Sequence, residues 1–110
     1  MKQYVLDELR PGDHQELKAH LDEQFQQPPI DDLYWLNIPA RHLSPTQRQH
    51  AACQPFYFAL ELRENALWVE LLVRSQTRIR CDCITYASAG QQRWLMGRID
   101  AILAELEIRI

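Results

Sequence analysis

With 110 residues, 46% of them apolar and 25% charged, the chain has the size and balance of one folded domain over residues 1–110, which excludes a disordered protein. A net charge of −3 lacks the basic excess with which proteins bind phosphate backbones, so no nucleic-acid partner is expected. No run of residues approaches the roughly 20 apolar positions that span a bilayer, and Asp7 and Glu8 stand where a signal peptide would be apolar. Three cysteines make a disulfide framework improbable and favour a reducing compartment, so the expected location is the cytoplasm.

The N-terminal third predicts one helix. Residues 1–10 fit either a short strand or a helical turn, and Pro11-Gly12 then interrupts the chain. Asp13 and Glu16 have the spacing of a capping box, so the helix is expected to begin at Asp13 and to end before Pro28-Pro29. Its apolar stripe recurs every four residues, at Leu17, Leu21 and Phe25.

A short strand and a short helix are expected next. The apolar run at 33–38 reads as a strand because Pro39 stops it. Ser44, Pro45 and Gln47 then carry the cap, first-turn proline and box partner of a helix start, which predicts a short helix over 45–53.

The strongest pattern is a β-hairpin. Apolar and polar residues alternate over 56–63 and again over 66–73, on either side of the polar turn Glu64-Asn65. A two-residue turn would place every apolar residue opposite an apolar partner. The expected pairs are Leu62 with Leu67, Leu60 with Val69, Phe58 with Leu71, and Phe56 with Val73.

A third strand over 79–86 and a long helix over 89–106 complete the prediction. Alternation in the strand places Ile79, Cys81 and Cys83 in the core and leaves Trp68, on the neighbouring strand, facing outward. Ser88 and Gln91 form a further capping box at the helix start. The expected fold class is therefore α+β, with an antiparallel sheet of three to four strands (meander 56–86) on which the N-terminal helix, the short helix 45–53 and the C-terminal helix 89–106 pack.

The thiols form the first candidate site. Cys81 and Cys83 share one face of the predicted strand, and His50 and Cys53 share one face of the short helix. Together they make a plausible tetrahedral set for zinc, although a one-residue gap between cysteines is tighter than in most structural zinc sites. The same thiols would also suit the core, where cysteine acts as a small apolar residue. A redox or nucleophilic thiol at Cys53 beside His50 is the third interpretation.

The second sheet face forms the other candidate site. It combines aromatic and arginine side chains, a composition that binding surfaces favour. Glu61, Glu70 and Asp82 on the same face would repel the phosphates of RNA. Two alternatives remain open: another segment of the chain covers this face, or its charges pair across strands and only solubilise it. The expected binding surface consists of Tyr57, Trp68, Arg74, Arg78, Arg80 and Tyr86.

These patterns predict a small binding or assembly module that acts through the aromatic and arginine face or by homodimerisation. Its partner would be a protein or a second copy, and neither a membrane nor a nucleic acid. No nucleophile with an evident base and no phosphate-cradling glycine loop points to an enzyme. The alternative is a protein that binds zinc or iron, or depends on a thiol, through His50, Cys53, Cys81 and Cys83. Zinc is the one cofactor that the residues suggest.

Overall fold

The fold is an antiparallel sheet with helices packed on it, as seen in a computed structural model that describes residues 2–109. Four strands lie in the order β1-β4-β3-β2, and the short β5 pairs with β3 as the fifth. The predicted α+β class is confirmed, including a short helix and a long C-terminal helix. In chain order the elements are β1 (Gln3–Leu6), α1 (Pro11–Gln24), β2 (Leu33–Asn37), the 3₁₀ helix η1 (Ala40–His42), α2 (Pro45–Gln49), the 3₁₀ helix η2 (Ala51–Cys53), β3 (Phe56–Arg63), β4 (Ala66–Glu70), β5 (Arg74–Ser75) and α3 (Ala89–Glu105).

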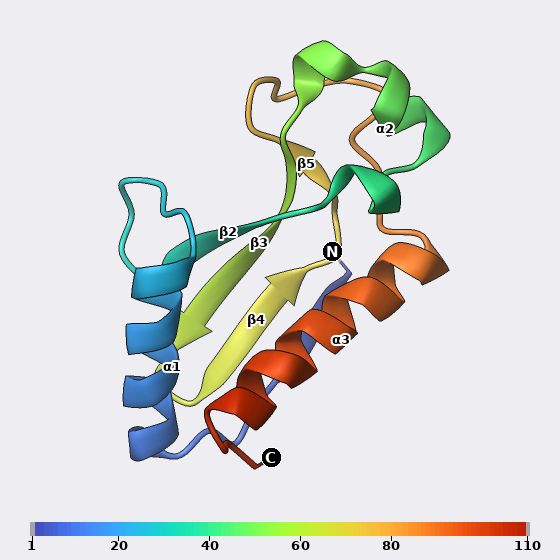
Figure 1. The fold of residues 1–110 in the computed structure, drawn as a ribbon. Helices are drawn as coiled ribbons and strands as arrows, with labels where there is room; N and C mark the ends of the chain where they lie inside the picture. The colour runs from blue at the N-terminus through green and yellow to red at the C-terminus, as the bar shows by residue number, and fades with distance from the viewer. Residues whose placement is uncertain (1, 110) are drawn as a thin grey trace.

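The two long helices, α1 and α3, pack on one face of the sheet (Figure 1). Phe58 and Leu60 of β3 point to that face and are completely buried, whereas Glu61 points away and is half-buried. Leu21 of α1 and Leu95 of α3 are fully buried in the same core. The opposite face, here called the outer sheet face, carries none of the helices within residues 2–109 (Figure 1).

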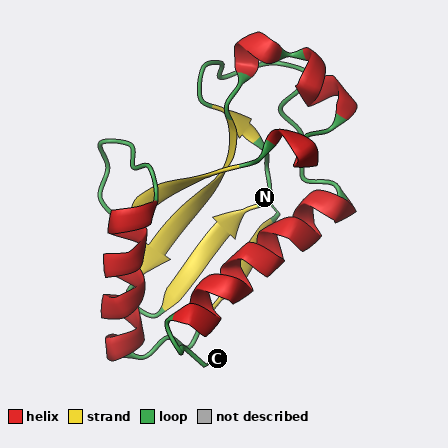
Figure 2. Ribbon diagram, in the orientation of Figure 1, coloured by secondary structure: helices red, strands yellow, loops and turns green. Residues whose placement is uncertain are grey.

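A group of short elements lies beyond one end of the sheet. Figure 2 shows η1, α2 and η2 gathered there beside the loop that follows β5. We call residues 40–55 and 76–88 the distal lobe. The predicted capping box from Ser44 to Gln47 is present, but the helix ends at Gln49 and restarts as η2 after a turn at His50.

The predicted hairpin register is confirmed near its turn and differs farther away. Leu60 pairs with Val69 and Leu62 with Leu67, as expected. Phe56, however, pairs with Ser75 and not with Val73. Residues 71–73 leave the ladder with β3, because Leu71 and Val73 donate their N–H groups to the carbonyls of Lys2 and Thr85 instead. The register beyond this irregular segment is consequently displaced by two residues.

The first element, which the sequence left open, is an edge strand. Residues 3–6 pair with β4, and Leu6 lies opposite Leu67. Helix α1 then begins at Pro11, two residues before the expected start at Asp13. A proline fits the first helical position because it has no N–H to satisfy. Asp13 lies in the first turn, two residues further on, and accepts a hydrogen bond from the Arg10 backbone N–H.

The predicted strand over 79–86 is wrong. Its only strand-like contact is an isolated bridge between Tyr86 and Leu72. Ile79, which was expected in the core, is 89% exposed. Two local turns prevent a strand from forming despite the alternating pattern. In the first, Ser75 Oγ accepts the N–H groups of Thr77 and Arg78. In the second, the Ile84 N–H donates to the Cys81 carbonyl. Local side-chain bonding to the backbone here competes with the sheet ladder.

Within the described part of the chain, none of the helices combines the length and apolar character that crossing a membrane requires.

Candidate metal centre

The turn between α2 and η2 places the first two potential ligands. His50 ends α2 with φ −96° and ψ 63°, which redirects the chain into the single turn of η2. The Cys53 N–H donates to the His50 carbonyl at 2.9 Å. This tight geometry brings the imidazole and the thiol within 4.8 Å of each other, although the two residues do not share the face of one helix as predicted.

The loop after β5 supplies the other two ligands and is tied to η2 by hydrogen bonds. Ser75 Oγ donates to the Cys53 carbonyl, and Thr77 Oγ1 donates to the Ala52 carbonyl at 2.7 Å. The loop then doubles back in the turn that begins at Cys81 and includes Cys83. These contacts bring a segment some 30 positions away along the chain against η2.

All four predicted ligand atoms lie together. One ligand atom from each of His50, Cys53, Cys81 and Cys83 lies within 4.8 Å of every other. His50 Nδ1 is 3.0 Å from Cys81 Sγ, and Cys53 Sγ is 3.8 Å from Cys81 Sγ. Cys53 and Cys83 are buried while His50 and Cys81 are half-buried, so the cluster lies at the surface of the distal lobe with its floor in the core. None of the three cysteines forms a disulfide.

Two neighbouring thiols of the cluster differ in how readily they ionise. Hydrogen bonds from the backbone N–H and the thiol of Cys83, with smaller contributions from His50 and Cys53, lower the pKa of Cys81 to about 7. Burial, with smaller contributions from the neighbouring thiols Cys81 and Cys53, raises the pKa of Cys83 to about 12. The cluster therefore already stabilises one thiolate, and a bound cation would favour ionisation of the others.

A buried glutamine forms a hydrogen bond to the backbone of the cluster. Gln47 is completely buried, and its Nε2 donates to the Cys83 carbonyl at 3.2 Å. Its Oε1 accepts from Gln91 Nε2 at 2.9 Å, which joins the cluster to the first turn of α3. The sequence reasoning gave Gln47 and Gln91 only capping roles, and it did not identify Ser75 or Thr77. A serine at the end of a short strand, with a threonine two residues later, was the available signal for a side-chain turn.

The residues of the second candidate surface do not form one continuous set. Trp68 is half-buried on the outer sheet face, and the Arg63 guanidinium lies 4.1 Å from the centre of its ring. Tyr57 is buried there against Trp35, with ring centres 4.8 Å apart. Arg74 forms an ion pair with Glu70.

The remaining three residues of that surface lie elsewhere. Tyr86 is 43% exposed, next to Lys2, whose Nζ is 5.3 Å from its ring centre. Arg78 and Arg80 are exposed in the loop that leads to Cys81, because the strand expected to align them with Trp68 does not form. Trp35 of β2 was missed, since nothing in the sequence located β2 beside β3.

Comparisons with protein-family models, with curated proteins and with solved structures found no match for this chain. Any functional conclusion is therefore drawn from the geometry of the chain itself.

Proposed function

We propose that this chain is a small binding module whose distal lobe is held together by a structural zinc ion. The observation that carries the proposal is the convergence of one imidazole nitrogen and three sulfurs, all within 4.8 Å of one another, from two segments far apart in sequence. Zinc bound by four such ligands is tetrahedral, with Zn–S bonds of about 2.3 Å and hence about 3.8 Å between sulfurs. The separation of Cys53 Sγ and Cys81 Sγ, 3.8 Å, has this value.

The donor set favours zinc and a structural role. Thiolates are soft ligands that select zinc or iron over calcium and magnesium, and a Cys₃His set is a recognised zinc combination. Four protein ligands close the coordination shell, whereas catalytic zinc retains a position for water or substrate. The proposed ion would thus stabilise structure and would not catalyse a reaction.

A bound ion would stabilise the distal lobe, which has little regular structure of its own. It contains three helices of three to five residues each and a long loop, and it has few strand-to-strand backbone hydrogen bonds of its own. Short helices of this kind are not stable by themselves, and a metal that binds only the folded form adds its binding free energy to folding. We further propose that the chain acts in the reducing cytoplasm, where its thiols stay available as ligands.

Metal content of the purified protein tests the proposal. Protein prepared without chelator should contain one zinc per chain, and His50→Gln or Cys83→Ser should abolish stoichiometric binding. His20→Gln is the matched control, because His20 is half-buried on α1, an element separate from the distal lobe. Cobalt titration gives a second measurement, since tetrahedral cobalt with thiolate ligands absorbs visible light. Wild-type protein without stoichiometric zinc or iron and without a tetrahedral cobalt spectrum would contradict the proposal.

A second candidate function is self-association through the outer sheet face. Trp35, Tyr57 and Trp68 lie there without a covering helix in the described chain, and Trp68 lines a cavity of about 280 Å³. Glu61 and Arg63 form an ion pair with each other on this face, and a copy related by two-fold symmetry could exchange these partners across the interface. Sedimentation equilibrium should show a dimer that Trp68→Ser dissociates. A monomer at every protein concentration would contradict it.

A further inference from the structure

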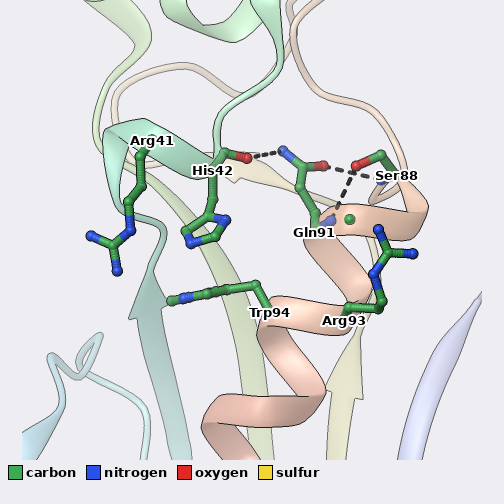
Figure 3. Close-up of a pocket in the computed structure, with 7 residues that line it drawn as sticks. Arg41, His42, Ser88, Gln91, Arg93 and Trp94 are labelled. Atoms are coloured by element: carbon green, nitrogen blue, oxygen red, sulfur yellow. Dashed lines mark hydrogen bonds between the residues drawn. The ribbon is translucent and has the colours of Figure 1, made fainter.

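A second cavity lies where η1 meets the first turn of α3. It has a volume of about 550 Å³, is open to solvent and is lined by seven residues (Figure 3). That volume falls in the range of small-molecule sites and is far larger than a simple inorganic ion needs. This cavity is separate from the four-ligand cluster and shares none of its residues. The lining consists of Arg41, His42, Ser88, Gly90, Gln91, Arg93 and Trp94.

The charge of this cavity opposes that of the whole molecule. The chain carries −3 overall, yet the lining contains two arginines and no carboxylate. Neither Arg41 nor Arg93 forms an ion pair with any described residue. The two arginines lie on opposite sides of the cavity (Figure 3), so an anion between them is attracted by both. The Arg93 Nη2 lies over the first turn of α3, 3.8 Å from where a Cβ of Gly90 would stand.

The floor of the cavity is rigid and partly aromatic. The rings of His42 and Trp94 pack with centres 5.4 Å apart and an interplanar angle of 32°. Trp94 also stacks on Phe58 of the core, at 6.4 Å and 24°. Gln91 is buried and donates to the His42 carbonyl at 2.9 Å, which holds η1 against α3 (Figure 3). A site held by core packing and buried hydrogen bonds needs little ordering on binding.

We propose that this cavity binds a small organic phosphate. Its phosphate would lie between Arg41 and Arg93, because guanidinium groups match phosphate oxygens in pairs. Its organic part would fill the remaining volume against His42 and Trp94, where a planar ring can stack. The Ser88 hydroxyl, which accepts the Gln91 N–H, retains its own hydrogen to donate toward the phosphate.

Calorimetric titration of the protein as purified tests this inference, with adenosine monophosphate, ribose 5-phosphate, inorganic phosphate and adenosine as probes. At least one of the two organic phosphates should bind saturably at about 1 mM or below, more tightly than inorganic phosphate and adenosine. Amide shifts in the NMR spectrum should be confined to η1 and the first turn of α3.

An Arg41→Gln/Arg93→Gln variant should bind that phosphate about tenfold or more weakly, while retaining the thermal midpoint of the wild type. Arg109→Gln is the matched control, because Arg109 is exposed and does not line the cavity. Three results would overturn the inference: no saturable binding of either organic phosphate, equal binding of adenosine or inorganic phosphate, or an equal loss in Arg109→Gln. Because none of the four proposed zinc ligands lines the cavity, failure here would leave the zinc proposal standing.

Discussion

Tyr34 of β2 is the phenol most completely removed from solvent, with none of its surface exposed. Its hydroxyl donates to Asp22 of α1, so it links sheet and helix. Burial and this hydrogen bond raise the pKa of Tyr34 from 10.0 to about 12. A group whose pKa is raised by folding stabilises the folded state below its unfolded pKa and loses that contribution as the pH rises through the folded value. The affected window is therefore between about pH 10 and about pH 12.

We expect Tyr34→Phe to reduce the loss of stability that alkaline pH causes in the wild type. The variant should lose about 1 kcal/mol at neutral pH with the Asp22 hydrogen bond, yet fall less between about pH 8 and about pH 11 than the wild type does. Denaturant unfolding at the two pH values measures both effects. Tyr86→Phe, at an exposed phenol, should follow the wild-type curve. Parallel pH curves for Tyr34→Phe and wild type would contradict this account.

At the scale of elements, a buried amide network joins α2 to α3. Gln47 contacts the Cys83 carbonyl on one side and Gln91 on the other, and both glutamines are capping-box partners at the starts of their helices. Each glutamine thus serves its own helix and also connects that helix to a distant segment. The network connects the candidate metal centre to the cavity between Arg41 and Arg93.

We expect Gln47→Leu to destabilise the fold by about 2 kcal/mol or more, because a leucine of similar size leaves the Cys83 carbonyl without its donor and removes one of the two acceptors of the Gln91 amide. Gln49→Leu is the control on the same helix, where the side chain is exposed and the change should stay within about 0.5 kcal/mol. Denaturant unfolding separates the two. Equal effects would mean that burial of the amide does not matter.

At the scale of the whole molecule, we expect two parts of the chain to differ in local stability. The sheet with α1 and α3 forms most of the apolar core, whereas the distal lobe adds Leu43, Cys53, Cys83 and Ala87 to it and otherwise relies on short helices, loop hydrogen bonds and the proposed zinc ion. Regions with few buried apolar contacts open more readily than a core does.

We expect zinc removal by a chelator to act locally. Amide hydrogen exchange should accelerate over 45–53 and 76–84, while β3 and β4 retain most of their protection. The thermal midpoint should fall and recover when zinc is restored. Exchange that accelerates evenly over the whole chain, or does not change at all, would contradict this division.

Features of this fold that depend on near neighbours were predicted well. Alternation over 56–70 located the hairpin and its inward face, and two capping boxes marked the starts of α2 and α3, since each signal lies within a few residues. The four potential ligands were also named together, but only as one of three interpretations of the thiols. Spacing along the chain cannot show whether two segments meet.

Features that depend on contacts between distant segments were settled only by the tertiary structure. The alternation at 79–86 was as regular as in the hairpin, yet Ser75 turned the chain toward η2, and the segment became a loop that carries Cys81 to His50. The cavity between Arg41 and Arg93 likewise joins residues from two separate elements. A sequence by itself determines which residues can pair or turn locally. The tertiary structure decides which distant segments meet, because segments with different local preferences must pack together around one shared core.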